Sequence, residues 1–138
     1  MGSKAHLVRA LYDAFARRDA EAMLGSLAHD IIWNEAEGNP YANGNPYEGP
    51  REIAEGVFRR LMTEWSGFSI HPEATYEDGE TVVAVGHYTG THRETGRRIK
   101  AQFAHVWTIR HGRVVRFQQY TDTLQLSEAS GLAVAASV

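Results

Sequence analysis

The dominant spacing of apolar residues changes near Phe68, from a helical repeat to a strand repeat. Before that point Leu7, Leu11 and Phe15 recur every four residues, which puts them on one face of a helix. Beyond it, apolar and polar residues alternate and β-branched residues are frequent, as in half-buried strands. The sequence therefore predicts an α+β fold, in which helices pack on one face of a mainly antiparallel sheet.

Three helices are expected before the change of pattern. The first covers 4–18, and the second runs from Ala20 to Leu27 with Asp19 as its N-cap. The third begins at Gly49-Pro50, because proline suits the first helical position, where no amide hydrogen is needed. The predicted strands are 31–33, 68–77, 80–91, 97–110 and 113–122. Asp78-Gly79 and His111-Gly112 are tight-turn signals that predict hairpins between the strands on either side.

The length of 138 residues suits a single domain, 1–138, with 1–3 and 127–138 expected to be frayed ends. The formal net charge of −3 does not favour a nucleic-acid partner, which would need a basic surface. No apolar run can span a membrane, and no secretory signal is visible. The chain has no cysteine, which suits a reducing compartment. We therefore expect a cytoplasmic protein.

Glu35 is the first candidate for polar chemistry. It lies two residues after the apolar run Ile31-Ile32-Trp33, where a buried strand opens into the Asn-, Gly- and Pro-rich loop 34–49. A loop this long in a compact domain usually covers a site or is mobile. A carboxylate beside an indole could lose hydration and gain a pKa useful to a general base. The alternative is a solvated loop carboxylate.

His105 lies in the apolar strand 101–109 and shares one face with Phe103 and Trp107. That bulky aromatic face is expected to point into the core or a cavity wall, where a histidine can donate, accept or shuttle a proton. The alternative is a core histidine with one buried partner. Around the turn at Gly112, position 105 is expected roughly opposite Gln119.

Asp122 ends the last predicted strand, about three residues beyond the position opposite His105. A contact between the two side chains would fix the tautomer of the imidazole and raise its basicity. The alternative is that Asp122 caps the turn into the tail. No histidine pair has metal-binding spacing and no glycine-rich phosphate loop is present, so neither a metal nor a cofactor is predicted.

Three strings that together span nearly the whole chain resemble the NTF2-like superfamily, and within it the SnoaL-like and ketosteroid-isomerase-related proteins. They are 11-LYDAFARRDAEAMLGSLAHDIIW-33, 47-YEGPREIAEGVF-58 and 105-HVWTIRHGRVVRFQQYTDT-123. The resemblance implies a cone of three helices on a curved sheet, a deep apolar pocket, and a homodimer formed through the outer face of the sheet. It aligns Glu35 with the general-base carboxylate of ketosteroid isomerase and His105 with its oxyanion-hole acid. It aligns the catalytic helix tyrosine with Leu11, one position away from Tyr12.

The resemblance and these residues together predict a cofactor-independent enzyme of the isomerase or cyclase type, acting on a small hydrophobic carbonyl compound. Glu35 is expected to abstract a proton, His105 to stabilise or protonate the oxyanion, and Asp122 to orient His105. The expected pocket residues are Trp33, Tyr47, Phe103, Trp107 and Tyr120. The alternatives are a binding protein that holds a small ligand without chemistry and a structural dimerisation module.

Overall fold

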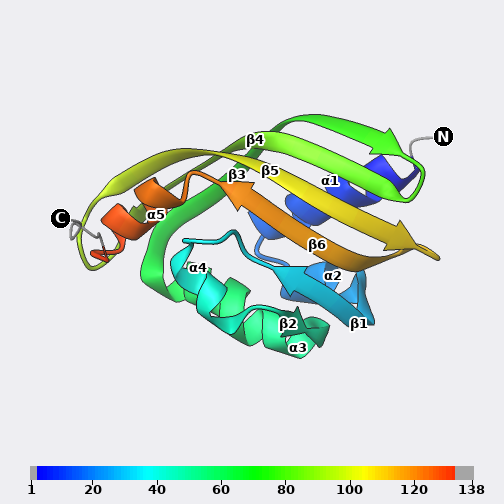
Figure 1. Cartoon of the computed structure of the whole chain (residues 1–138), viewed down its shortest axis with the longest axis horizontal. Helices are drawn as coiled ribbons and strands as arrows, with labels where there is room; N and C mark the ends of the chain where they lie inside the picture. Colours follow the sequence, from blue (N-terminus) through cyan, green and yellow to red (C-terminus); the bar gives the residue numbers. More distant parts are fainter. Residues whose placement is uncertain (1–2, 133–138) are drawn as a thin grey trace.

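The computed structural model describes residues 3–132 and has the predicted α+β architecture. A curved six-stranded sheet forms one layer, with strand order β2-β1-β6-β5-β4-β3, and the helices lie against it (Figure 1). The strands are β1 (Leu27–Asn34), β2 (Tyr47–Glu48), β3 (Trp65–Asp78), β4 (Thr81–His92), β5 (Arg98–Arg110) and β6 (Arg113–Thr121). The four long C-terminal strands agree with the predicted alternation, and β3 begins three residues earlier than expected.

The N-terminal helices are shorter than predicted. Helix α1 spans Ser3–Ala16 and α2 spans Ala20–Gly25, with the Asp19 side chain accepting a hydrogen bond from the Ala22 amide as expected of an N-cap. Arg18 has a φ of 58°, which ends the first helix before the predicted boundary. The second ends at Gly25 because Leu27 already belongs to β1.

The third predicted helix is present but interrupted. It consists of α3 (Gly49–Ile53), a π-helical turn (Ala54–Phe58) and α4 (Arg59–Glu64). Tyr47 packs against the π-helical turn, and a Cβ at Gly56 would lie 2.2 Å from the Tyr47 Cε1 atom. Only glycine therefore allows the helix to approach the ring so closely.

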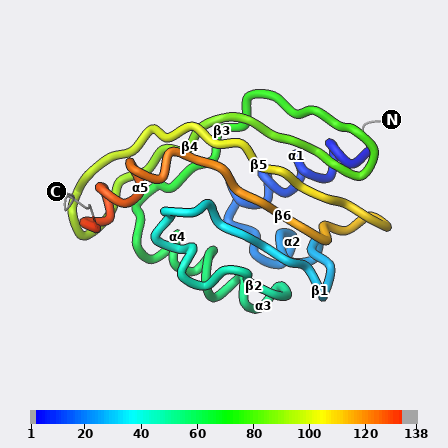
Figure 2. Tube along the Cα trace, viewed as in Figure 1, coloured from blue at the N-terminus to red at the C-terminus, as the bar shows by residue number. Residues whose placement is uncertain are grey.

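Strand β1 makes the sheet mixed, a feature that no local sequence pattern indicated. It pairs in parallel with β6, where Trp33 lies beside Phe117 and Asn34 beside Gln118. Every other pairing in the sheet is antiparallel. The parallel pairing places the loop after β1 next to the C-terminal end of β6 (Figure 2), where the Ala36 amide donates to the Gln119 side chain at 3.0 Å.

The predicted frayed tail is wrong for its first part. Residues Thr123–Ala129 form helix α5, which buries Leu126 and Ala129 in a hydrophobic cluster that includes Phe15, Phe68 and Phe103. Its short apolar stripe was too brief to be recognised as a helical repeat. At the other end, Ser3 is the first residue of α1. Residues 1–2 and 133–138 of the predicted frayed ends lie outside the described residues.

Among residues 3–132, no helix has both the length and the apolar character that crossing a membrane requires.

Candidate functional site

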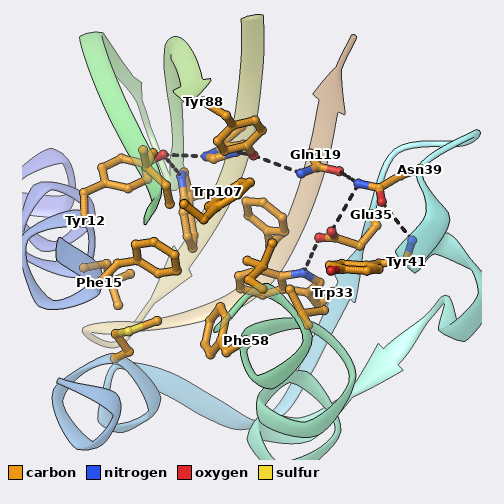
Figure 3. A pocket seen from close by; sticks show the side chains of 18 of the residues that line it. Tyr12, Phe15, Trp33, Glu35, Asn39, Tyr41, Phe58, Tyr88, Trp107 and Gln119 are labelled. Carbon is orange, nitrogen blue, oxygen red and sulfur yellow. Dashed lines mark hydrogen bonds between the residues drawn. The ribbon is translucent and has the colours of Figure 1, made fainter. Parts of the chain in front are cut away.

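A cavity lies between the concave face of the sheet and the helices, and its walls are mostly apolar (Figure 3). Strand β1 and the π-helical turn supply apolar walls, and α1, β4, β5 and β6 supply mixed ones. The polar side chains that line it are Tyr12, Glu35, Asn39, Tyr41, Tyr88, His105 and Gln119. Glu35 and His105, predicted from sequence as candidates, therefore face the same cavity, as the resemblance implied.

Glu35 follows the last residue of β1 and is only 4% exposed, although it carries a carboxyl group. The Trp33 indole donates to its Oε2 at 2.8 Å, and the Asn39 amide donates to its Oε1 at 3.4 Å. Burial raises the pKa of Glu35 to about 7, and the Trp33 hydrogen bond and the Arg60 charge oppose that rise. The solvated alternative is excluded by this burial. Near neutral pH the carboxyl group can both release and accept a proton.

The loop after β1 forms part of the cavity wall. The Asn45 side chain holds the backbone of Glu35 at both ends: its Oδ1 accepts from the Glu35 amide at 2.9 Å and its Nδ2 donates to the Glu35 carbonyl at 2.8 Å. Asn39 caps the short helix Pro40–Gly44 by accepting from the Tyr41 amide at 2.8 Å. These side-chain bonds to the backbone fix the loop and set the position of the carboxylate.

His105 is 3% exposed and stacks on Phe103, with 4.0 Å between ring centroids. Its Nδ1 lies 2.7 Å from the Tyr12 hydroxyl, and its Nε2 is hydrogen-bonded to the Tyr88 hydroxyl. Burial lowers the pKa of His105 to about 3, so the ring is neutral at physiological pH. Both nitrogens are already engaged, which leaves the tyrosine hydroxyls as the polar groups of this wall.

Sequence reasoning missed several polar residues of the cavity, among them Tyr12 and Tyr88. Tyr12 follows Leu11, the position to which the catalytic helix tyrosine of ketosteroid isomerase aligns. Its side chain nevertheless faces the cavity, where the Trp107 indole donates to its hydroxyl group at 3.0 Å. In the sequence, core packing is enough to explain Tyr88. Burial raises the pKa of both hydroxyl groups, which are therefore protonated. The two tyrosines can be recognised as site residues only from the tertiary structure, which places the ring of His105 between their hydroxyl groups.

Gln119 connects the two sides of the cavity. Its register opposite His105 is the predicted one. Its Nε2 donates to the Tyr88 hydroxyl at 2.9 Å, and its Oε1 accepts from the Asn39 side chain at 2.7 Å. A continuous chain of hydrogen bonds thus runs from Glu35 through two amides to Tyr88, His105 and Tyr12 (Figure 3).

The expected contact between Asp122 and His105 is not formed. Asp122 is exposed and is the N-cap of α5, where its Oδ1 accepts from the Gln125 amide at 3.4 Å and its Oδ2 from the Gln125 side chain at 2.9 Å. The two ring nitrogens of His105 are occupied by tyrosines. The alternative role, a cap on the turn into the tail, is the one that the structure supports.

Replacing Asp122 by Ala is expected to lower the free energy of unfolding by about 1 kcal/mol, because it removes the N-cap of α5. Asp122→Asn keeps an acceptor oxygen and is expected to stay within about 0.5 kcal/mol of the wild type. Urea unfolding of both variants measures the difference. Equal losses in the two variants would show that the charge, and not the cap, is what matters.

The other predicted pocket residues fall into three groups. Trp33 and Trp107 line the cavity. Phe103 supports it from behind by stacking on His105. Tyr47 is buried outside the cavity and holds the loop, since its hydroxyl donates to the Tyr41 carbonyl at 2.6 Å. Tyr120 is 56% exposed on the opposite face of β6, because it is adjacent to the inward-facing Gln119 and alternate residues of a strand face opposite ways.

Within residues 3–132, no cluster of three histidine, aspartate or glutamate side chains has an arrangement that could hold a metal ion.

Helices on the concave face of a curved sheet, with an apolar cavity between them, define a pocketed protein of the NTF2-like class. The chain belongs to the SnoaL-like family, because the family model of the SnoaL-like domain matches residues 8–117. No match to the chain was found among curated proteins.

Three solved structures illustrate the similarity. An NTF2-like protein from Burkholderia thailandensis E264 is 40% identical, with a TM-score of 0.87 and coverage of 94% of this chain and 98% of the other. An NTF2-like protein of unknown function from Burkholderia pseudomallei K96243 is 32% identical, with a TM-score of 0.85 and the same coverage. TerC, co-crystallised with polyporic acid, is 27% identical, with a TM-score of 0.82 and coverage of 93% and 98%.

Proposed function

We propose that this protein catalyses cofactor-independent proton transfer next to the carbonyl group of a small hydrophobic compound, as an isomerase or a cyclase does. One observation carries the proposal: Glu35, a buried carboxyl group with a pKa of about 7, shares an apolar cavity with the hydroxyl groups of Tyr12 and Tyr88. A base and neutral hydrogen-bond donors in one water-poor site are what enolate formation requires.

The proposed reaction begins when ionised Glu35 takes a proton from the carbon next to the carbonyl. The electron pair of that C–H bond forms the enolate double bond, and the carbonyl π pair moves onto oxygen. A tyrosine hydroxyl group donates a hydrogen bond to this oxygen as it becomes negative. Glu35 then returns the proton to carbon, which completes an isomerisation or exchange without any cofactor.

The aromatic walls strengthen this chemistry. The rings of Trp33, Trp107 and Phe117 contact one another in edge-on, stacked and tilted pairs, with centroid distances of 3.9–5.8 Å. They limit the access of water to the carboxylate and the hydroxyl groups. Hydrogen bonds to a developing charge are worth more in such a site than in water.

In this proposal His105 acts through its neighbours. Its pKa of about 3 makes it a weak proton acceptor, and each ring nitrogen already has a tyrosine partner. The imidazole therefore positions the two hydroxyl groups and does not itself protonate the oxyanion. Asp122 takes no part, since it is exposed at the N-terminus of α5.

The test is the exchange of hydrogen for deuterium next to the carbonyl of small cyclic and aromatic ketones in heavy water, followed by proton NMR. The enzymatic rate per mole of protein is expected to rise with pH through about 7 and then level off, because the base must be ionised. A rate that falls as pH rises through 7, after subtraction of the protein-free rate, would contradict a basic role for Glu35. Exchange no faster than without protein across the panel would contradict the proposal.

A second function, binding without chemistry, has its own supporting observation. Among the described residues, every buried side-chain nitrogen or oxygen already has a hydrogen-bond partner within the protein. The polar network could therefore serve only to shape a pocket, and TerC, with its bound polyporic acid, is a relative that holds a small organic molecule. A ligand recovered unaltered, together with no exchange on any ketone, would favour this function.

We include in the proposal a homodimer formed through the outer face of the sheet and a cytoplasmic location.

A further inference from the structure

The imidazole of His105 lies between two tyrosine hydroxyl groups, one on each ring nitrogen. A neutral imidazole has one N–H donor and one acceptor nitrogen. It must therefore donate to one tyrosine and accept from the other. Which tyrosine does which depends on the tautomer of the ring, and the neighbours of each tyrosine determine the consequence for its hydroxyl proton.

The direction of the hydrogen bond at Tyr88 is fixed by the protein backbone. The Ala36 amide, which can only donate, bonds to Gln119 Oε1 at 3.0 Å. This contact identifies that atom as the oxygen of the side-chain amide, so the Nε2 group on the other side must be the one facing Tyr88. The Tyr88 oxygen accordingly accepts a hydrogen bond from Gln119, whatever the tautomer of His105.

The direction at Tyr12 is fixed by an indole. The Trp107 Nε1 group lies 3.0 Å from the Tyr12 oxygen, and an indole nitrogen can only donate. The Tyr12 oxygen is therefore also an acceptor in either tautomer. Each tyrosine oxygen therefore accepts from one fixed donor, Trp107 or Gln119, in both tautomers. The acceptor of each tyrosine's own hydroxyl proton is still to be determined.

We propose that His105 is a positioning residue whose tautomer frees the hydroxyl proton of either Tyr12 or Tyr88, one at a time, for a hydrogen bond to an oxygen atom of a ligand. When Nδ1 carries the ring proton, it donates to the Tyr12 oxygen, and the Tyr88 hydroxyl group donates to Nε2. Tyr12 is then the free donor. When Nε2 carries the proton, the roles are reversed.

This arrangement specifies the chemistry of the ligand at this wall. One hydroxyl proton needs an acceptor, which a carbonyl, enolate or phenolate oxygen provides. Either tyrosine can donate to a ligand oxygen near it, because the ring proton can move to the imidazole nitrogen beside that tyrosine and so free its hydroxyl proton. The choice of ligand oxygen rests on the proposed function, whereas the behaviour of the ring in the free protein does not.

The experiment is nitrogen NMR of ligand-free protein labelled in histidine, with the His105 signals assigned by their loss in His105→Gln. Protonated and unprotonated ring nitrogens have separate shifts. In Tyr12→Phe the ring proton is expected on Nε2, and in Tyr88→Phe on Nδ1, because a buried N–H without a partner is rarer than a buried acceptor without one. The wild type is expected to show one ring proton at neutral pH.

Trp107→Phe provides a milder test that keeps both tyrosines. Without the indole donor, the Tyr12 oxygen needs the ring N–H, so the population is expected to shift towards the Nδ1–H tautomer. Adding p-nitrophenolate to the wild-type protein is expected to change the tautomer population as its oxygen takes the free hydroxyl proton. In Tyr12→Phe/Tyr88→Phe its affinity is expected to fall about 10-fold or more.

The inference is overturned if the ring carries two protons at neutral pH, or if both single variants have the same tautomer. It is also overturned if the double variant binds p-nitrophenolate as well as the wild type does, or if the wild type does not bind it. The tautomers are measured without ligand. Opposite tautomers together with no ketone exchange would therefore reject the proposed function alone, and equal tautomers together with exchange would reject this inference alone.

Discussion

Glu35→Gln is expected to lower the rate of ketone exchange by about 100- to 10,000-fold, the usual contribution of a positioned general base. Glutamine keeps the size of the side chain and an oxygen that can accept from the Trp33 indole. It cannot take a proton from carbon. The loss is therefore expected in the rate at saturating substrate, whereas binding should change far less.

The same variant has a second signature, in stability. The folded pKa of Glu35, about 7, lies above its ordinary value of 4.5, so folding favours the protonated form. The stabilisation of the wild type from this group is complete below about pH 4.5 and is lost as pH rises through about 7. At 1.36 kcal/mol per pKa unit the loss is about 3 kcal/mol, which Glu35→Gln cannot show.

Urea unfolding of both proteins across this pH range measures the difference. The gap in unfolding free energy between variant and wild type should move in favour of the variant as pH rises. Glu37→Gln is the matched control, because Glu37 is an exposed carboxylate in the same loop. An equal pH dependence in wild type and Glu35→Gln would mean that Glu35 titrates normally, and the proposed base would lose its physical support.

Phe117→Ala is expected to destabilise the protein by about 3–5 kcal/mol, the range found when a buried aromatic side chain is removed. Phe117 is 2% exposed and stacks on Trp33, with 3.9 Å between centroids. It also contacts the rings of Trp107 and His105. Its loss would leave a cavity beneath the site, so the unfolding midpoint in urea should fall sharply.

Tyr120→Ala is the matched control for that prediction. It removes a large aromatic side chain from the same strand, three residues away, but on the exposed face. A change within about 0.5 kcal/mol is expected. A loss comparable to that of Phe117→Ala would mean that the outer face of β6 is buried in the native protein, as a homodimer through this face would require.

Local patterns in the sequence predicted most of the fold. Alternation predicted the four long strands, and the turn at His111-Gly112 predicted the register that pairs His105 with Gln119. The same alternation implied that His105 faces the interior. These features depend on neighbours within a hairpin, so short-range spacing contains the information.

Glu35 could be proposed as a site residue from the sequence, but its burial could not be predicted. A carboxylate two residues after an apolar run is compatible with water or with the interior. Its burial depends on the Asn45 clamp on its backbone and on Gln119, which accepts from the Ala36 amide. Asp122, by contrast, is exposed and takes no part in the site, because α5 begins beside it and its carboxylate caps that helix.

The sequence by itself determined the first three helices, the four long strands, the inward face of β5 and the candidacy of Glu35 and His105, because these depend on residue spacing and on near neighbours in the chain. Only the tertiary structure brought Tyr12, 93 residues away in sequence, and Tyr88, 17 residues away, onto the two nitrogens of one imidazole. It also set Glu35 beside β6 through the parallel pairing of β1. The pKa of Glu35 and the neutrality of His105 arise from this burial, since the cost of charge depends on everything that excludes water.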